Sequence, residues 1–213
     1  MVIPKNLIWD LDGTLIDSEL SIALCLQNVL IRYGYKYSSG LNSSYRGLPL
    51  MDLIREVLPE SASQKLIEEV ASDFKSEYDI EYCTHAPIFP EILDFHNQFP
   101  TFQFMIATNK RRFPTQRIVK EVLESFNISQ IVCCDDQGIF SKKDMIVKII
   151  NDQGWSSDSV VYIGDTDADA QSAHKASVDF LMVKWSSSQR SRSDIGLSYD
   201  SFLDSLRQKG FNI

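Results

Sequence analysis

Two aspartates near the start of the chain, Asp10 and Asp12, lie in the run DLDGT directly after a short apolar segment. Carboxylates this close in sequence can serve one point if the chain turns there, and Gly13 permits such a turn. Transfer of a phosphoryl group needs a nucleophile, a proton carrier and a cation that offsets the charge of the transferred group. Two neighbouring acids can divide such roles when their surroundings differ. The alternative for this run alone is an Asx turn with incidental acids.

A second acidic run, GDTDAD at residues 164–169, also follows an apolar segment. Its carboxylates repel one another unless a cation offsets their charge. Oxygen ligands of this kind favour a hard ion such as Mg²⁺, so the three acids of this run, Asp165, Asp167 and Asp169, indicate a cation nearby. The alternative is an acidic helix N-terminus, which the helix dipole stabilises without any ion.

Further polar residues could bind a phosphate. Thr108 and Asn109 follow the apolar run MIA, where a hydroxyl and exposed backbone N–H groups could hold phosphoryl oxygens, although such a pair also forms ordinary turns. Lys142 begins an expected helix, where the dipole disfavours a cation, and this position favours a functional explanation. Lys143 is a competing candidate and is expected to be a solvated neighbour. Lys110 is either a minor phosphate contact or a surface residue.

The elements that would position these residues alternate between strands and helices. Apolar runs of strand length occupy residues 7–9, 102–107, 131–134, 160–163 and 180–183. Helical spacing occupies residues 114–126, 142–153, 167–176 and 202–209. Between residue 17 and about residue 86 the pattern is helical only, with stretches at residues 18–33, 50–57 and 63–82.

Alternating strands and helices imply parallel strand pairing with right-handed crossovers. The expected fold class is therefore α/β, with a doubly wound, Rossmann-like parallel sheet and an inserted all-α cap domain. Residues 1–16 and 87–213 would form the core, and residues 17–86 the cap. In such sheets ligands bind beyond the carboxyl ends of the strands. The polar residues that stand at those ends are Asp10, Thr108, Asn109, Asp135, Asp136 and Asp165.

Taken in this order, the motifs resemble those of the haloacid dehalogenase-like superfamily over nearly the whole chain. DLDGTLIDS from residue 10 matches the first motif, Thr108-Asn109 the second, Lys142 the third and GDTDAD from residue 164 the fourth. The run TNKRRFPT, the DS after the first motif and the helical insertion look like the phosphoglycolate phosphatase-like branch, which carries a helical cap. The chain departs from the usual pattern after the expected helix at residues 167–176, where Ala176-Ser177 replaces Ala-Gly.

The resemblance implies a Mg²⁺-dependent phosphoric monoester hydrolase. Asp10 would be the nucleophile and form an aspartyl-phosphate, and Asp12 would protonate the leaving group and then activate water. Mg²⁺ would be held by the side chains of Asp10 and Asp165 and by the backbone carbonyl of Asp12.

The remaining site residues would serve the phosphoryl group. By the same resemblance, Thr108 and the backbone of Asn109 would bind phosphoryl oxygens, and Lys142 would neutralise them. Asp169 would orient Lys142 or a metal-bound water. Arg46, in the run YRGLPL of the cap, would contact a substrate anion or else lie at the surface.

Four functions compete for a chain with these motifs. The expected one is hydrolysis of a short phosphomonoester such as phosphoglycolate. A β-phosphoglucomutase-like phosphotransferase would share the core motifs and differ in the cap. Hydrolysis of a carbon–halogen bond is disfavoured, because Asp12 and the metal-binding acids would have no use. A receiver-like signalling domain without enzymatic activity is disfavoured by the helical insertion.

The composition sets outer limits on partners. The chain has 213 residues, 44% of them hydrophobic and 23% charged, which is typical of a folded globular protein. A net charge of −8 argues against nucleic acid or an anionic membrane as partner. The expected partner is a small phosphorylated metabolite, with the protein a monomer or a homodimer. Four cysteines without CxxC spacing indicate reduced thiols and a cytoplasmic protein.

Overall fold

The computed structural model describes residues 6–36, 48–185, 199–211 and 213. Arg46 therefore lies outside the described residues. The strands found there form one parallel sheet in the order β3-β2-β1-β4-β5. Their bounds are β1 (Asn6–Trp9), β2 (Gln103–Thr108), β3 (Asn127–Cys133), β4 (Val160–Gly164) and β5 (Asp179–Met182). The prediction of a doubly wound α/β sheet is confirmed, with β1 at the centre.

Side chains of the central strands alternate between two apolar layers, as the pleat of a strand requires. Leu7 and Trp9 of β1 pack in one cluster of buried residues, whereas Ile8 packs in the other. Neighbouring strands repeat this division, with Phe104 in the first layer and Met105 in the second. A parallel sheet covered on both faces needs strands that are apolar on both sides, which explains their continuous apolar runs.

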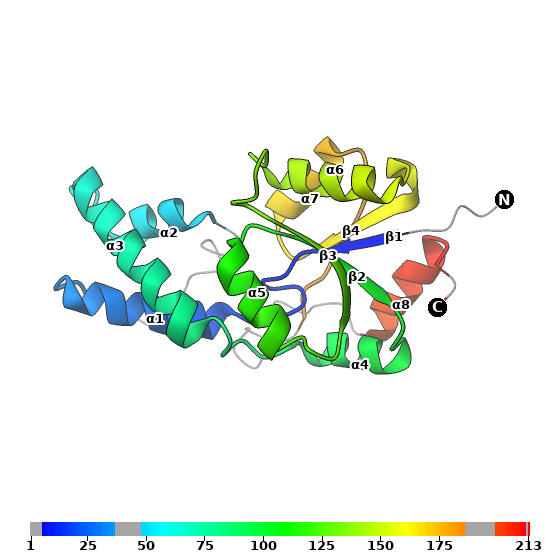
Figure 1. The fold of residues 1–213 in the computed structure, drawn as a ribbon, viewed down its shortest axis with the longest axis horizontal. Coiled ribbons are helices and arrows are strands. Elements are labelled where there is room, and N and C mark those ends of the chain that lie inside the picture. Colours follow the sequence, from blue (N-terminus) through cyan, green and yellow to red (C-terminus); the bar gives the residue numbers. More distant parts are fainter. Residues whose placement is uncertain (1–5, 37–47, 186–198, 212) are drawn as a thin grey trace.

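Helices cover the two faces of the sheet (Figure 1). On one face lie α6 (Lys142–Gln153) and α7 (Asp167–Lys175), and on the other α4 (Pro90–Gln98), α5 (Arg112–Glu121) and α8 (Tyr199–Gln208). A short 3₁₀ turn, η3 (Ser157–Ser159), precedes β4. Helix α4 is not among the helical stretches whose bounds are given above. Pro90 begins it at the first helical position, where a missing N–H costs no hydrogen bond.

The helical insertion consists of the elements between β1 and α4. They are α1 (Glu19–Arg32), α2 (Leu50–Val57), α3 (Gln64–Glu77) and the π-helical turn η2 (Tyr78–Tyr82). They lie beside the sheet, toward the carboxyl ends of its strands (Figure 1). The expected helix at residues 63–82 is thus an α-helix that ends in a π-turn.

The two chain segments that join the insertion to the sheet run side by side. The Asp17 N–H donates to the Pro87 carbonyl (2.8 Å), and the Phe89 N–H donates to the Leu15 carbonyl (3.1 Å). An antiparallel bridge pairs Ile16 with residue 88. The insertion therefore leaves and re-enters the sheet domain at one place, which is the geometry of a segment inserted into an existing fold.

Candidate active site

The loop after β1 is fixed at two points. The Asp10 N–H donates to the Ile163 carbonyl (2.8 Å), which extends the pairing of β1 and β4 by one residue beyond β1. Farther along, the Trp185 indole N–H donates to the Thr14 carbonyl (2.6 Å), and both side chains are fully buried. Asp10 therefore leaves the end of the central strand in a defined direction.

Glycines bring the two acidic motifs into contact. Gly13 has a φ of 77°, and a Cβ there would lie 2.3 Å from the Oδ2 atom of Asp165. At the end of β4, a Cβ on Gly164 would lie 2.7 Å from the Cβ of Asp169. Both positions accept only a residue without a side chain. A larger residue at Gly13 would displace the Asp165 carboxylate, and one at Gly164 would displace Asp169.

Asp10, Lys142 and Asp169 form a buried charge cluster. The Lys142 Nζ atom lies 2.9 Å from Asp10 Oδ2 and 2.7 Å from Asp169 Oδ1. Their side chains are 8%, 7% and 1% exposed, so solvent contributes little to balancing their charges. The unfavourable position of Lys142 at the start of α6 is thereby explained, because two facing carboxylates outweigh the helix dipole.

The electrostatics of this cluster follow from its burial. Burial raises the pKa of Asp10 well above its usual range; Lys142 opposes this rise, and the Asp169 and Asp165 carboxylates add to it. Burial alone would lower the pKa of Lys142, but the facing Asp10 and Asp169 carboxylates help to raise it well above its usual range. The lysine is therefore charged at neutral pH, and the site favours additional positive charge beside Asp10.

Both carboxylate oxygens of Asp169 accept hydrogen bonds. Its Oδ2 accepts hydrogen bonds from the Thr166 N–H (3.1 Å) and the Thr166 hydroxyl (2.5 Å), while its own N–H donates to that hydroxyl. This reciprocal capping box begins α7. Its Oδ1 accepts from Lys142 and from the Tyr162 hydroxyl (3.4 Å), which also donates to the Ala107 carbonyl. Asp169 thus fixes Lys142 relative to the sheet.

The carboxylates present a site that suits a hard cation. Among the described residues, Asp10, Asp165 and Asp169 can each offer one oxygen, and these oxygens lie within 4.8 Å of one another. The two oxygens of Asp169 already accept the hydrogen bonds described above. The oxygen-only chemistry of this group fits Mg²⁺, with Asp10 and Asp165 as its members outside the capping box of α7.

Asp12 has different surroundings from Asp10. Its side chain is 29% exposed, and its Oδ1 atom lies 3.1 Å from the Nζ atom of Lys110. The Lys110 side chain is only 8% exposed, and its Nζ donates to the Tyr78 hydroxyl (2.9 Å). Burial lowers the pKa of Lys110, but Asp12 and Tyr78 together raise it above its usual range. Lys110 is thus a buried partner of Asp12, in contrast to the surface residue that the sequence left open.

The other polar residues at strand ends follow β2 and β3, and their hydrogen bonds differ. The buried Thr108 hydroxyl accepts a hydrogen bond from the Lys110 N–H (3.1 Å), and the following Asn109 is exposed. After β3, the Asp135 side chain accepts from the Arg112 N–H (2.7 Å), and Asp136 forms an ion pair with the Arg112 guanidinium. Asp135 and Asp136 therefore fasten the start of α5 to the turn after β3.

Comparison with known proteins places the chain in a family. The family model of the haloacid dehalogenase-like hydrolases matches residues 7–183, which include all of the acidic residues described above. The chain belongs to the haloacid dehalogenase-like hydrolases. The predictions of this family and of a hydrolytic enzyme are confirmed.

Named relatives of this hydrolase are phosphatases. The chain is 27% identical over 189 residues to a phosphoglycolate phosphatase of Aquifex aeolicus, with 85% of each chain covered. It is 22% identical over 185 residues to the pyrophosphatase PpaX of Oceanobacillus iheyensis, covering 85% of this chain and 84% of the relative. A haloacid dehalogenase-like hydrolase from Streptococcus pneumoniae shares the fold with a TM-score of 0.77 and 20% identity, over 100% of this chain and 93% of that one.

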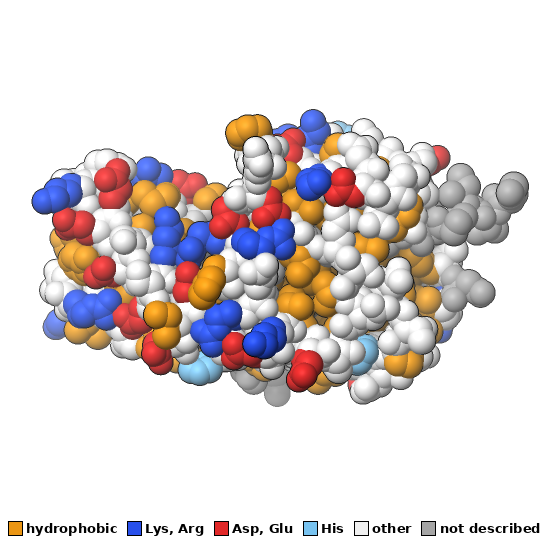
Figure 2. All heavy atoms as spheres, viewed as in Figure 1, with side chains coloured by type: hydrophobic (Ala, Val, Ile, Leu, Met, Phe, Trp, Pro, Cys, Tyr) orange, Lys and Arg blue, Asp and Glu red, His pale blue; other side chains and the backbone are white. Residues whose placement is uncertain are grey.

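The surface of the hydrolase carries charges of both signs. Figure 2 shows acidic and basic side chains interspersed over the insertion and α5, without a single-sign face in that view. In the described part of the chain, no helix has the length and apolarity needed to cross a membrane.

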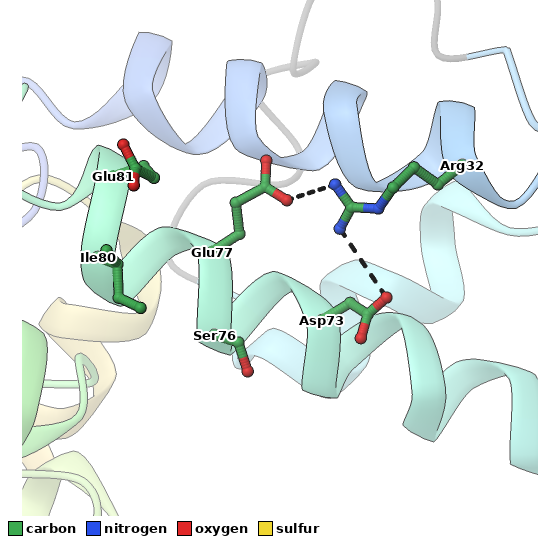
Figure 3. A pocket seen from close by; sticks show the side chains of 6 residues that line it. All are labelled: Arg32, Asp73, Ser76, Glu77, Ile80 and Glu81. Atoms are coloured by element: carbon green, nitrogen blue, oxygen red, sulfur yellow. Dashed lines mark hydrogen bonds and ion pairs between the residues drawn. The ribbon is translucent and has the colours of Figure 1, made fainter.

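An open recess of about 350 Å³ lies on the helical insertion, lined by residues of α1, α3 and the π-turn η2 (Figure 3). Arg32 forms ion pairs with Asp73 and Glu77, so the one basic side chain of the lining is already engaged by carboxylates of α3. None of the described site residues lines it. The acids at the strand ends therefore remain the candidate active site of the hydrolase.

Proposed function

We propose that this hydrolase is a Mg²⁺-dependent phosphatase that cleaves a small phosphomonoester through an aspartyl-phosphate on Asp10. The observation that carries the proposal is the buried charge cluster, in which Lys142 faces Asp10 while Asp165 stands close by. A bare phosphoryl group is highly charged, and a site for it needs both a nucleophile and local positive charge.

The two aspartates of the first motif would divide the chemistry. The Asp10 carboxylate attacks phosphorus, the bond between phosphorus and the leaving oxygen breaks, and Asp12 gives its proton to that oxygen. The Asp12 carboxylate then takes a proton from water, which attacks the aspartyl-phosphate and releases inorganic phosphate and free Asp10. The greater exposure of Asp12 suits a residue that exchanges protons with substrate and water.

Other residues would hold and neutralise the phosphoryl group. We propose that Thr108, the Asn109 backbone and Lys142 bind its oxygens, with Asp169 orienting Lys142 through their 2.7 Å contact. A Mg²⁺ held by Asp10, Asp165 and the Asp12 carbonyl would supply further positive charge against the phosphoryl oxygens.

The helical insertion would act as a cap over this site. We propose that residues 17–86 form the cap, and residues 1–16 and 87–213 the core. Support comes from the paired connections at Ile16 and residue 88, and from the place of the insertion beside the strand ends (Figure 1). A cap of this kind would exclude water while the ester is cleaved. A role of Arg46 in contacting substrate stays a prediction.

The substrate is proposed to be a short phosphomonoester similar to phosphoglycolate. The names of both relatives support phosphate chemistry, and one of them is a phosphoglycolate phosphatase. The panel for a first test should therefore hold phosphoglycolate, several alkyl phosphates, p-nitrophenyl phosphate and pyrophosphate, each with Mg²⁺ or with EDTA.

We expect release of inorganic phosphate with Mg²⁺ and none with EDTA. Asp10→Asn should lower kcat by at least about a thousandfold, because a neutral amide cannot attack phosphorus. Asp135→Asn is the matched control, since this exposed strand-end aspartate contacts Arg112 and should leave kcat unchanged. A protein inactive on the whole panel, or an active Asp10→Asn variant, would refute the proposal. Transfer of the phosphoryl group to a sugar phosphate in preference to water would instead identify a phosphotransferase.

A readout besides activity tests the metal site. Mg²⁺ that binds only the folded protein raises the unfolding free energy by about 2.7 kcal/mol at 100 times its Kd. This gain should be present in the wild-type protein and lost in Asp165→Asn.

A further inference from the structure

Lys110 connects the helical insertion to the first acidic motif. Its Nζ atom lies 3.1 Å from Asp12 Oδ1, 2.9 Å from the Tyr78 hydroxyl and 4.6 Å from the centre of the Tyr78 ring. Asp12 belongs to the loop after β1, Lys110 follows β2, and Tyr78 begins the π-turn of the insertion. One buried ammonium group, carried by the segment after β2, therefore contacts two other segments of the fold.

The π-turn that carries Tyr78 is itself fastened to the core. Arg111 forms an ion pair with Asp79 (2.7 Å), and Arg117 of α5 donates to the carbonyls of Asp79 (2.6 Å) and Ile80 (2.8 Å). Asp79 and Ile80 of the π-turn thus contact two arginines that belong to α5 or directly precede it. Tyr78 also stacks on Phe74 inside the insertion, with ring centres 5.3 Å apart. Burial of Tyr78 and this stacking hold its hydroxyl beside Lys110.

Asp12 needs such a support more than Asp10 does. The Asp10 carboxylate is already held by Lys142, whereas Asp12 is 29% exposed and has Lys110 as the basic side chain facing it among the described residues. A carboxyl group transfers a proton efficiently only when it is aimed at the leaving oxygen.

We propose that Lys110 is a positioning residue for the acid–base Asp12, and that Tyr78 of the insertion holds Lys110 in place. With Oδ1 held by Lys110, Oδ2 is the oxygen that gives the proton to the leaving group and later takes one from water. The packing of the insertion on the core thereby controls the acid–base. This inference rests on the proposed phosphatase function, and it concerns Lys110 and Tyr78, to which that function assigned no role.

The test compares substrates that need a proton with substrates that do not. An alkoxide leaves only when it is protonated, whereas p-nitrophenolate leaves as an anion. The value of kcat/KM covers the steps up to departure of the leaving group, so it reports on Asp12 acting as an acid. It should be measured with Mg²⁺ for p-nitrophenyl phosphate and for the best alkyl phosphate of the panel that has no second acidic group.

Lys110→Met removes the ammonium and keeps most of the side-chain volume. We expect it to lower kcat/KM about a hundredfold for the alkyl phosphate and less than about tenfold for p-nitrophenyl phosphate. Tyr78→Phe removes only a hydroxyl and should show the same preference with a smaller loss, about fivefold for the alkyl ester. Lys110→Arg should recover part of the loss. Lys143→Met and Tyr33→Phe are the matched controls and should resemble the wild-type protein with both esters.

Each other outcome has a definite meaning. Equal losses with both esters, in variants that melt like the wild-type protein, would show a structural role and overturn the inference. A loss that follows a carboxylate on the leaving group, measured with phosphoglycolate against the plain alkyl ester, would assign Lys110 to substrate binding and also overturn it. Active wild-type protein with unaffected variants refutes this inference alone. Wild-type protein inactive on every ester refutes the proposed function and this inference together.

Discussion

Gly13 is the residue at which the first acidic motif touches the fourth. Its φ of 77° already strains any other residue, and a Cβ there would also lie only 2.3 Å from Asp165 Oδ2. Gly13→Ala should therefore lower the unfolding free energy by about 2–4 kcal/mol, measured by urea denaturation. It should also reduce the stabilisation by Mg²⁺, because Asp165 has to move.

Gly34 provides the matched control for this substitution. Its φ is 80°, but a Cβ there would meet no atom within 4 Å. Gly34→Ala should cost only the conformational strain, about 1 kcal/mol. The difference between the two variants measures the collision with Asp165. Equal costs would mean that the acidic motifs do not pack as described.

At the scale of single residues, the sequence predicts which residues lie together when both belong to the same motif. Asp10 and Asp12, or Asp165 and Asp169, are close in the chain, so spacing alone indicates a common site. Lys110 behaves differently, because its burial depends on Tyr78 from the insertion, and no local pattern joins them. The only local signal was its place two residues after the end of β2, where a basic side chain can reach the edge of the sheet that carries the acids.

Helix α7 ends in a motif that is better suited to glycine. The Ser177 N–H donates to the His174 carbonyl (3.0 Å) and the Val178 N–H to the Ala173 carbonyl (3.1 Å), which is the Schellman pattern. This pattern places Ser177 in the left-handed region, with a φ of 57°. The departure from Ala-Gly noted in the sequence therefore leaves a strained residue at a helix end.

Ser177→Gly should raise the unfolding free energy by about 1 kcal/mol, because glycine adopts a left-handed conformation without the steric cost of a Cβ. Urea denaturation measures this gain, provided that the unfolding free energy of both proteins falls equally steeply with urea concentration. Gly154→Ser is the reciprocal variant, since Gly154 ends α6 with a φ of 65° and open space around it. It should lose a similar amount. A Ser177→Gly variant that is less stable than the wild-type protein would contradict this account.

The elements that sequence patterns misplaced have weak local signals. Strand β3 begins at Asn127, four residues before the predicted start, because it is an edge strand whose first residues are exposed or half-buried and partly polar. The start of helix α4 was not predicted, because Pro90 can either end one segment or begin the next, and only the burial of Ile92 and Phe95 decides between them. The central strands were predictable because both of their faces are buried.

At the scale of the whole molecule, helix α8 packs against the apolar core beside the strand that leads to Asp10. Phe202 of α8 is fully buried, with its ring centre 5.8 Å from that of Trp9 and 5.3 Å from that of Trp185. Trp9 precedes Asp10, and Trp185 holds the loop that follows it. The packing of helix α8 therefore supports the two tryptophans that fix the position of Asp10 and of the loop after it.

Phe202→Ala should lower the unfolding free energy by about 3–5 kcal/mol, the usual cost of removing a buried aromatic ring. Thermal or urea unfolding measures this loss. Phe140→Ala is the control, because Phe140 is 92% exposed and should change the stability by less than about 0.5 kcal/mol. Similar effects for the two phenylalanines would show that α8 does not pack against the sheet.

The central position of β1 has a consequence for how the chain folds during synthesis. Ile8 pairs with Met105 on one side and with Tyr162 on the other, so β1 waits during synthesis for partners that are translated much later. Contacts between such distant segments make folding slow, and β1 exposes its apolar faces until they form. Because Asp165 follows β4, the last neighbour of β1 to be made also brings the fourth motif to Asp10. A nascent chain that stops before β4 therefore lacks both a central strand enclosed on its two sides and the contact between the first and fourth acidic motifs.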